Sequence, residues 1–404
     1  MSRPLRRART TVEATKPLSG SPIPLAEPSI GGNEWAYIKE CLDSGWVSSV
    51  GSFVDRFEAD FATYLGVGHA VATANGTAAL HVALLAAGVA PGDEVLIPSF
   101  TFIAPANAVR YAGARPVFVD AESTTWQMDV GRVAEFLETQ CRWSDGELLN
   151  KKSGRRIAAI LPVHVLGHSV DLDPLLAVAA KFDIPVIEDA AESLGATYRD
   201  RYVGRFGRLA CFSFNGNKVM TTGGGGMVVT DDAALAKRVR YLTTTAKDDA
   251  DEGIHGQVGF NYRLTNIQAA MGCAQLEQLE GFLAAKRRIA ARYMEALDGL
   301  PDLSLMPEEP WAKNAFWLYS IRLDPSHAPC DARELRRRLR GAGIDTRSFW
   351  QPLHLSPAHV GAQVLGGAVA ERLYREVLSL PCSTGLSESA QGRVIAAIRG
   401  CLAP

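Results

Sequence analysis

A lysine beside a run of glycines is the feature of this sequence that most clearly suggests chemistry. The stretch "SFNGNKVMTTGGGG", residues 213–226, places Lys218 between Ser213 and four consecutive glycines. A phosphate-binding P-loop needs its glycines before the lysine and Ser or Thr directly after it, and Val219 stands there instead. A lysine held in a turn between strands, with glycines that clear space beside it, indicates a Schiff base with a carbonyl compound. Such a lysine reacts only in its neutral form, which burial or a nearby cation favours.

The run "IPVIEDA" ends in two adjacent carboxylates, Glu188 and Asp189. Asp189 lies at the carboxyl end of an expected strand, which is where open α/β sheets bind their ligands. Neighbouring residues of a strand point to opposite faces, so one acid can face a site while the other faces packing or solvent. An acid at a strand end can equally cap the next helix, and both interpretations stay open at this point.

An expected junction of strand and helix carries Asn75, Gly76 and Thr77. The free N–H groups and the positive dipole end of a helix favour phosphate there, and glycine lets the anion approach the backbone. Such junctions are common, so this motif alone is weak support for a ligand. Phe102 follows another strand end, where an aromatic side chain usually belongs to the core but can also present its ring to a planar ligand.

Two histidines and seven cysteines bear on metal binding. His164 and His168, in "HVLGH", have the i, i+4 spacing of a helical metal pair, but they straddle a strand end and a glycine that interrupt such a helix. The cysteines are scattered and contain no C-x-x-C pair, which disfavours a structural zinc site and a disulfide framework. We therefore expect no metal and a reducing, cytoplasmic location.

The composition of the whole chain disfavours several classes of protein. The 404 residues carry a formal net charge of −2, without the basic excess that nucleic-acid binding needs. No run of 18 or more apolar residues occurs, so we expect no membrane span. Four arginines and no acid stand within the first eleven residues, and residues 1–22 are expected to form a flexible basic extension.

Short apolar runs alternate with longer helical patterns between residues 66 and 260, which indicates βαβ units and a largely parallel sheet. We expect a large α/β domain over residues 23–270, interrupted by a polar insertion, "WSDGELLNKKSGRR". One long helix is expected over 265–297, leading into a smaller α+β domain, residues 271–404. The candidate residues above fall at or near the ends of these expected strands.

Seven segments of the chain together resemble the DegT family of pyridoxal-phosphate-dependent nucleotide-sugar aminotransferases. They recur in the order found in that family, over about residues 23–400, and are "SGWVSSVGSFVDRFEADFATYLG", "ATANGTAAL", "PGDEVLIPSFTFIAPANAV", "GARPVFVD", "VIEDAAESLGA", "FSFNGNKVMTTGGGGMVVTDD" and "GFNYRLTNIQAAMGCAQL". Each segment alone is weak, but the ordered set is specific. The resemblance implies an α/β protein of the type I aminotransferase fold, with a mostly parallel sheet in a large cofactor domain and a smaller C-terminal α+β domain.

The resemblance also implies roles for the candidate residues. Lys218 would hold pyridoxal 5'-phosphate as a Schiff base and, once freed, carry the proton between cofactor and substrate. Asp189 would pair with the pyridinium nitrogen, so that the ring acts as an electron sink. The phosphate would be held by Gly76, Thr77 and Ser213.

Three further residues are implied by their positions within the family motifs. Phe102 matches the aromatic position that stacks on the cofactor ring. Asn261, in "GFNYR", matches the residue that reaches the cofactor phosphate of the neighbouring subunit, because the family works as a homodimer with active sites at the interface. Glu192 stands where many relatives have His or Gln, and "GGGG" replaces their "GEGG". We group Glu192 with the cofactor-binding residues, and contact with the substrate sugar and plain packing are its alternatives.

The expected reaction moves an amino group from L-glutamate to a keto group, at C4, of a nucleotide-linked deoxy sugar. The two departures, with "SFNGNK", resemble the branch that acts on UDP-linked 2-acetamido-4-keto-2,4,6-trideoxy sugars for polysaccharide or lipopolysaccharide synthesis. The alternatives are amination at C3 or C4 of a dTDP- or GDP-linked keto-6-deoxy sugar, or a regulatory protein that binds the cofactor without turnover. Contacts to the sugar are expected from residues 46–51 and 347–354.

Overall fold

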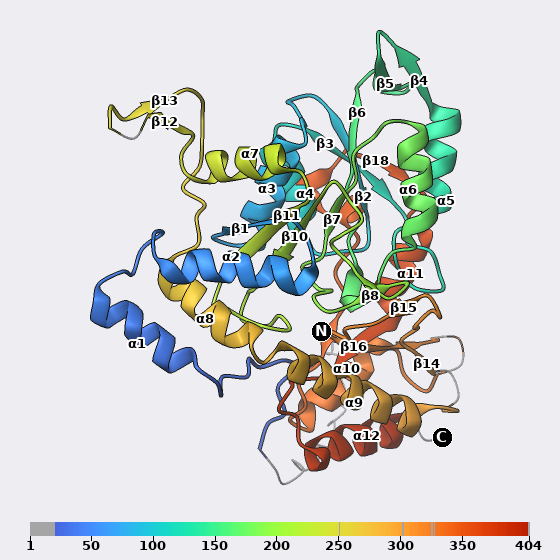
Figure 1. Ribbon diagram of the computed structural model, residues 1–404. Coiled ribbons are helices and arrows are strands. Elements are labelled where there is room, and N and C mark those ends of the chain that lie inside the picture. The colour runs from blue at the N-terminus through green and yellow to red at the C-terminus, as the bar shows by residue number, and fades with distance from the viewer. Residues whose placement is uncertain (1–20, 250, 301–302, 325, 327, 403–404) are drawn as a thin grey trace, which may run out of the picture.

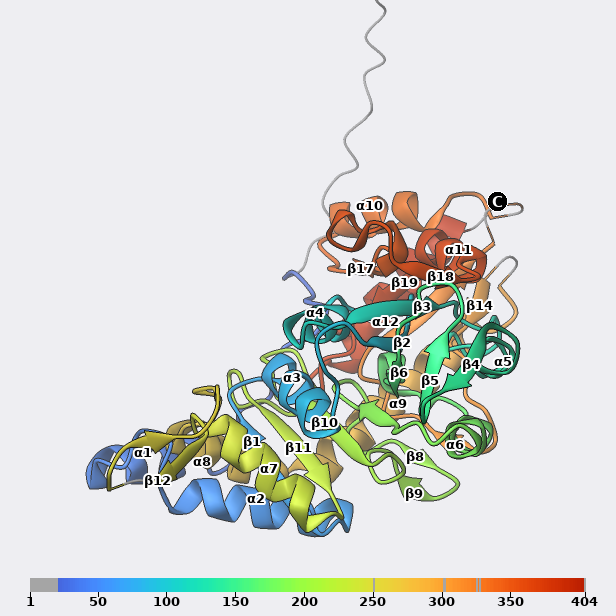
Figure 2. The ribbon, with the colours of Figure 1, turned by 90° about the horizontal axis from the view of Figure 1, so that it is seen from above.

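Two four-stranded sheets meet edge to edge at the centre of the protein (Figures 1 and 2). Isolated parallel bridges join them, from Ile160 to Val186 and from Val163 to Asp189. Within these sheets every strand pair is parallel except the two that involve β11, which confirms the expected mostly parallel sheet. In spatial order the strands are β18 (Gln363–Leu365), β3 (Arg115–Val119), β2 (Glu94–Pro98), β6 (Ile157–Ile160), β7 (Ile187–Asp189), β10 (Leu209–Ser213), β11 (Gly226–Thr230) and β1 (His69–Thr73).

The structure is a computed structural model that describes residues 21–249, 251–300, 303–324, 326 and 328–402. The expected basic extension, residues 1–22, therefore lies outside the described residues except for its last two.

Helices cover the central strands, which explains why β2, β6 and β11 are buried along their whole length. Helix α2 packs on β1, whereas α3 and α7 pack on β11. The helices up to β11 and directly after it are α1 (Glu34–Ser44), α2 (Ser52–Leu65), α3 (Gly76–Ala86), α4 (Ala104–Tyr111), α5 (Val130–Glu135), α6 (Leu172–Lys181) and α7 (Ala233–Thr243).

The polar insertion expected between β3 and β6 folds as a hairpin. Strand β4 (Cys141–Ser144) pairs antiparallel with β5 (Glu147–Asn150), and the hairpin projects at the top of Figure 1. Two other small sheets lie outside the central one. The first pairs β12 (Lys247–Asp249) with β13 (Ile254–His255). The second has three strands, in which β8 (Thr197–Tyr198) pairs with β9 (Arg201–Tyr202) and with β15 (Ala312–Lys313).

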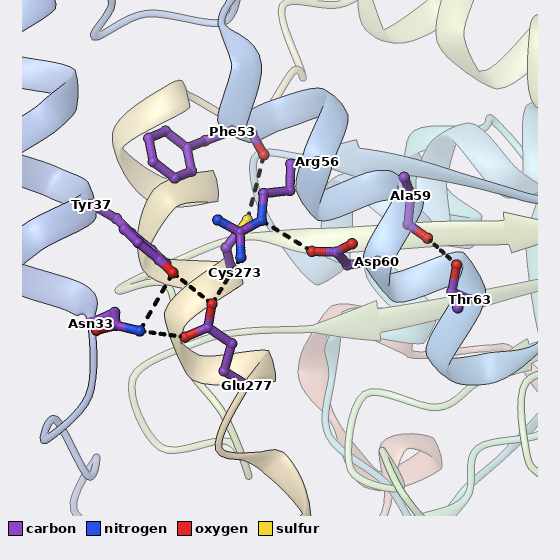
Figure 3. Close-up of polar contacts among 9 residues, drawn as sticks. All are labelled: Asn33, Tyr37, Phe53, Arg56, Ala59, Asp60, Thr63, Cys273 and Glu277. Carbon is purple, nitrogen blue, oxygen red and sulfur yellow. Dashed lines mark hydrogen bonds and ion pairs between the residues drawn. The ribbon is translucent and has the colours of Figure 1, made fainter.

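The single long helix expected over 265–297 is wrong, because the chain forms two helices, α8 (Asn266–Leu276) and α9 (Leu279–Leu297). Both residues of the break bind the start of α1. The Glu277 carboxylate accepts hydrogen bonds from Asn33 and Tyr37, both 2.7 Å, and pairs with Arg56 at 2.8 Å (Figure 3). The Gln278 amide donates to the Glu34 carboxylate, 2.8 Å. These tertiary contacts turn the chain although the helical periodicity of the sequence continues.

The C-terminal part forms an antiparallel sheet with helices around it, at the bottom of Figure 1. Its strands are β14 (Leu303–Leu305), β16 (Tyr319–Leu323), β19 (Val377–Leu380) and β17 (Arg347–Ser348), and its helices are α10 (Ala332–Gly341), α11 (Ala368–Glu376) and α12 (Glu388–Leu402). Two segments cross the expected boundary: β18 returns to pair with β3, and Ile23 forms a bridge with Ile344. The division at residue 270 stays a prediction.

Candidate active site

Lys218 lies on the loop that joins β10 to β11. The loop is closed at its base, where the Phe214 N–H donates to the Gly225 carbonyl at 2.9 Å. The Phe214 ring packs edge-on against Phe57 and Phe61, with centroids 5.2 and 5.5 Å away. The base of the loop is thereby fixed to the core, while the Lys218 side chain keeps 14% of its surface exposed.

Two side chains contact the Lys218 ammonium. Glu192 Oε1 lies 3.6 Å from Nζ, and Nζ lies 4.0 Å from the centroid of the Trp317 ring. Glu192 is buried, and this burial raises its pKa to about 7 against the opposing charge of Lys218. The indole N–H donates to the Asn217 carbonyl at 2.6 Å, which fixes the ring. A carboxylate and the face of an indole ring thus both lie next to Nζ, and no motif in the sequence predicted the contact with Trp317.

A strained turn at Val165–Gly167 positions both partners of Lys218. Leu166 has a φ of 62°, in the left-handed region that is unfavourable for this residue, and its N–H donates to Glu192 Oε2 at 2.9 Å. Gly167 has a φ of 100°, and a Cβ there would lie 3.0 Å from the backbone nitrogen of Trp317. The "HVLGH" segment therefore aims one N–H at Glu192 and lets the backbone of Trp317 come close.

Both histidines of this segment bond to protein groups. The Val170 N–H donates to His164 Nδ1 at 3.1 Å, so the proton is on Nε2, which donates to Glu188 at 3.0 Å. His168 donates from Nδ1 to the carbonyl of the following residue and accepts from the Glu309 N–H at Nε2, and burial lowers its pKa to about 4. Among the residues that the structure describes, no group of three or more His, Cys, Asp or Glu side chains is placed to hold a metal ion.

Glu188 and Asp189 face different surroundings, as the alternation of a strand requires. The Glu188 carboxylate is fully buried and accepts four hydrogen bonds, from His164 and from the backbone N–H groups of Gly204, Phe206 and Gly207. Burial acts to raise the pKa of Glu188, but these donors hold it below the ordinary value. Glu188 is thus a structural acid.

Asp189 is buried but only partly satisfied. Its Oδ1 accepts from the Ala191 N–H at 3.0 Å, and within the described part of the chain no donor reaches Oδ2. Burial raises its pKa, and the charge of Lys218 opposes that shift. Oδ2 is thus free to accept a hydrogen bond from a ligand. The position therefore suits an N–H group or a cation of a ligand.

The start of α3 packs closely against the carboxyl end of β10 and the amino end of β11. Asn75 caps the helix, since its side chain accepts from the N–H of the third helical residue at 2.8 Å. A Cβ on Gly76 would lie 2.8 Å from the Ser213 Cβ, and one on Gly226 would lie 2.6 Å from the Asn75 carbonyl carbon. The first N–H groups of the helix, including that of Thr77, have no carbonyl partner within it. Glycine at 76 and 226 thus leaves N–H groups and a serine hydroxyl in a place suited to phosphate.

Phe102 and Asn261 lie at the surface. Phe102 is 52% exposed, whereas the neighbouring Phe100 is buried in a stack with Phe349. Asn261 lines a separate cavity of about 390 Å³ together with residues 49–51, and Lys218 is not among the residues that line it. The structure thus groups Asn261 with a surface next to α2 and not with the lysine of its own chain.

The two stretches expected to contact the sugar differ in their surroundings. In the stretch 347–354, Trp350 stacks on Trp317, with centroids 6.5 Å apart, and so lies next to the partner of Lys218. In the stretch 46–51, the Trp46 carbonyl accepts from the Asn266 side chain at 2.8 Å. The roles of both stretches, and of each site residue above, stay predictions.

A lysine on the β10–β11 loop, a buried strand-end acid and a phosphate junction on this fold define the class of pyridoxal-phosphate-dependent enzymes with the type I fold. The chain belongs to the DegT/DnrJ/EryC1/StrS aminotransferase family, whose model matches residues 28–399. It is 42% identical to a GDP-perosamine synthase of Caulobacter vibrioides, over 93% of this chain and 97% of that protein. It is 38% identical to a GDP-perosamine synthase of Escherichia coli O157:H7, over 90% and 94%. A solved DegT DnrJ EryC1 StrS aminotransferase from Brucella abortus is 33% identical and has a TM-score of 0.84, over 92% of this chain and 96% of that chain.

The protein is therefore an aminotransferase that depends on pyridoxal phosphate and acts on nucleotide sugars, and the expected family, fold class and cofactor are confirmed. The described residues fit the cofactor. The unpartnered oxygen of Asp189 suits its ring nitrogen, the junction of Gly76 with Ser213 suits its phosphate, and Lys218 has an amine suited to its aldehyde. Across the described ranges, no helix is both long and apolar enough to cross a membrane.

Proposed function

We propose that this enzyme transfers the amino group of L-glutamate to the C4 keto group of a GDP-linked keto-6-deoxy sugar. The observation that carries the proposal is the identity of 42% and 38% with two proteins named GDP-perosamine synthase, over at least 90% of the chain. This similarity favours the GDP-linked alternative over the UDP-linked 2-acetamido sugar expected from "GGGG" and Glu192.

The surroundings of those two departures support assigning them to contacts within the chain. Glu192 contacts Lys218 and the Leu166 N–H, so its identity is tied to the lysine and a backbone turn. A Cβ on Gly224, the position of the glutamate in many relatives, would approach Gln268 at 3.5 Å and the Ala74 carbonyl at 3.9 Å. Both distances are ordinary contacts, so packing within the chain does not require glycine at this position.

In this proposal the cofactor, when bound, supplies an electron sink for the carbon that gains or loses the proton. Gly76, Thr77 and Ser213 hold its phosphate through N–H groups and a hydroxyl. Asp189 accepts from its ring nitrogen, and Phe102, at the surface after β2, covers its ring.

Lys218 moves the proton, and Glu192 adjusts its charge state. The lysine nitrogen accepts a proton only when it is neutral. Glu192, with a pKa of about 7 and an oxygen 3.6 Å from Nζ, can take up or return a proton near neutral pH. The Trp317 ring lies 4.0 Å from Nζ and contacts it as well. We therefore assign Glu192 to the lysine and not to the sugar.

The substrate is tested with a panel of GDP-, UDP- and dTDP-linked 4-keto sugars and L-glutamate, with products read by mass and sugar NMR. We expect amino transfer to the GDP-linked sugar at C4, with a kcat/KM at least tenfold above that for the other two. Preference for the UDP-linked 2-acetamido sugar would contradict the proposal, and amination at C3 would contradict its position.

Lys218→Ala tests the lysine itself. We expect the variant to lose the Schiff-base absorbance and the turnover, because alanine has no amine in place of Nζ. Lys39→Ala is the matched control, since Lys39 is an exposed lysine that pairs with Asp43 on α1. A Lys218→Ala protein that keeps the absorbance and its bleaching by glutamate would contradict the assignment.

We also propose a homodimer that buries the outer face of α1 and the segment after it. Trp35, Leu42, Trp46 and Val50 are 78%, 56%, 58% and 66% exposed, which is unusual for such large apolar side chains so close together in the chain. α1 lies at one edge of the molecule in both ribbon views (Figures 1 and 2). Light scattering should show a dimer for the natural chain and a monomer for Trp35→Asp. Trp143→Asp, which changes an exposed tryptophan on the β4–β5 hairpin, should stay dimeric.

Mixing two inactive variants tests whether Asn261 acts on the neighbouring subunit. A heterodimer of Lys218→Ala with Asn261→Ala would hold one intact site if Asn261 serves the partner, and none if it serves its own chain. After unfolding and refolding together, we expect recovery of about a quarter of the natural activity from random pairing. Refolding each variant alone is the control, and no recovery in the mixture would contradict the proposal.

We place the enzyme in the cytoplasm. All seven cysteines are free and six of them are buried, which suits a reducing compartment. Fractionation of cells that make the natural protein should recover it with cytoplasmic markers.

A further inference from the structure

A basic cavity lies where the β4–β5 hairpin meets the central sheet. It has a volume of about 340 Å³, which lies in the range of small-molecule sites. Four cationic side chains line it: Arg110 at the end of α4, Arg115 at the start of β3, and Lys152 and Arg155 after β5. The one carboxylate in its wall is Glu94, so the formal excess is three positive charges.

Three of these cations lack an ion pair. Within the described residues, no acidic side chain lies within 4.0 Å of the charged groups of Arg110, Arg115 or Lys152, and all three side chains are exposed. Arg155 alone approaches Glu94, with its Nε at 4.0 Å from Oε1. Exposed cations that repel one another around a cavity favour an anion between them.

A buried asparagine fixes the turn that carries two of the cations. Asn150 is fully buried, and its side-chain nitrogen donates to Glu94 at 2.7 Å and to Gln363 at 2.9 Å. Its side-chain oxygen accepts from the Lys152 N–H at 3.0 Å, and its own N–H donates to the Arg155 carbonyl at 2.8 Å. The turn is therefore tied to β2 and β18, so the backbone that carries Lys152 and Arg155 is fixed before any ligand arrives.

An imidazole without partners stands in the same wall. His359 is 6% exposed and lines the cavity, and neither ring nitrogen has a hydrogen-bond partner among the described residues. Its ring packs edge-on against Phe118 at 5.7 Å. A buried donor left unpaired is costly, and a rotation of the ring would direct one N–H to an anion in the cavity.

The cavity lies at the amino ends of the parallel strands, whereas the residues around Lys218 lie at the carboxyl ends. Glu94, Arg115 and Gln363 are the first residues of the parallel strands β2, β3 and β18, whereas Asp189 and Ser213 are the last residues of β7 and β10. A strand of five residues spans about 16 Å at roughly 3.3 Å per residue. A ligand in this cavity is thus too far away to belong to the site around Lys218.

We propose that this cavity binds a small polyanion that carries two or more phosphate groups. Guanidinium groups match phosphate oxygens in pairs, and the three excess positive charges match the charge of a diphosphate group. Such a ligand would connect the hairpin, the amino end of β3 and the segment before β18.

Calorimetry with inorganic pyrophosphate, on the enzyme loaded with pyridoxal phosphate, tests the proposal. We expect saturable binding of one pyrophosphate per chain, and affinities at least tenfold weaker for Arg115→Gln and for Lys152→Gln. Both residues are exposed, so the variants should keep the natural melting temperature and cofactor spectrum. Arg142→Gln is the matched control, because it removes one exposed charge from the same hairpin outside the cavity and should bind within twofold of the natural protein.

Two results would overturn the proposal. One is the absence of saturable binding to the natural enzyme at low salt, where screening is weakest. The other is equal affinity of the natural enzyme, Arg115→Gln and Lys152→Gln, which would place pyrophosphate elsewhere. Neither result bears on the substrate proposal, because the panel of keto sugars is read by its products.

Discussion

Replacing Glu192 by glutamine should stabilise the cofactor-free protein at neutral pH and leave its stability unchanged at acidic pH. The carboxyl is buried, 3.6 Å from Lys218, and burial raises its pKa from the ordinary value of 4.5 to about 7. Glutamine keeps the shape and can accept the hydrogen bond from Leu166, but it has no charge to bury. The comparison therefore isolates the cost of the ionised carboxyl.

The sign and size of the effect follow from proton linkage. Between pH 4.5 and 7 the folded protein holds a proton on Glu192 that the unfolded chain has lost, so the free energy of unfolding falls as the pH rises. Each pH unit costs about 1.4 kcal/mol, and the whole interval costs about 3 kcal/mol. For 404 residues the entropy of unfolding is about 0.85 kcal/mol/K, so the melting temperatures should differ by about 4 °C above pH 7.

Differential scanning fluorimetry of both proteins, from pH 4.5 to 8, measures this difference. We expect Glu192→Gln to melt with the natural protein at pH 4.5 and above it by a margin that grows up to pH 7 and then stays constant. Glu188→Gln is the matched control with the opposite sign, because its donors hold the pKa of Glu188 below the ordinary value. It should lower the melting temperature at neutral pH. Two results would refute both the raised pKa and the proton role given to Glu192. One is a difference in melting temperature between Glu192→Gln and the natural protein that does not change with pH, and the other is a lower melting temperature of the variant at pH 7.5.

Two further substitutions test the packing around the site. Gly226→Ala should lower the free energy of unfolding by about 2 kcal/mol and weaken cofactor binding, because its Cβ would lie 2.6 Å from the Asn75 backbone. Gly224→Ala is the control and should leave both quantities unchanged, because its Cβ meets nothing closer than 3.5 Å. Urea denaturation and titration with pyridoxal phosphate measure both, and equal behaviour of the two variants would contradict the argument. Lys286→Met should lower the free energy of unfolding by about 2–3 kcal/mol, because the buried ammonium donates to two carbonyls, at 3.0 and 2.9 Å. An unchanged urea midpoint would show that water can replace it.

The central sheet and the reactive lysine could be predicted because their signals are local. Buried strands appear as short apolar runs, and both β1 before Gly76 and β7 through Asp189 are such runs in the structure. The order of Lys218 and the glycines was enough to exclude a P-loop. Capping, turn chemistry and alternation act within a few residues of the chain, so the sequence displays them directly.

The break between α8 and α9 could not be predicted in this way. The apolar positions keep their helical spacing through Glu277 and Gln278, and only contacts with α1, more than 200 residues earlier, turn the chain there. The choice between Glu188 and Asp189 had the same limit. Alternation shows that they face opposite sides, but only the N–H groups of the loop at Gly204–Gly207 decide which side is satisfied.

The surroundings of Lys218 combine signals that the sequence shows with one that it hides. Lys218 and Glu192 come from motifs in the first 220 residues, whereas Trp317 comes from the segment before β16. The turn at Leu166 and Gly167 joins the two, since one residue directs an N–H to Glu192 and the next lets Trp317 approach. A charge change at Glu192 and a shift of Trp317 therefore act on the same nitrogen. The chemistry of the lysine depends on the packing of the C-terminal segment as well as on the motif around it. The motif therefore predicts the lysine, but it does not predict the contact with Trp317.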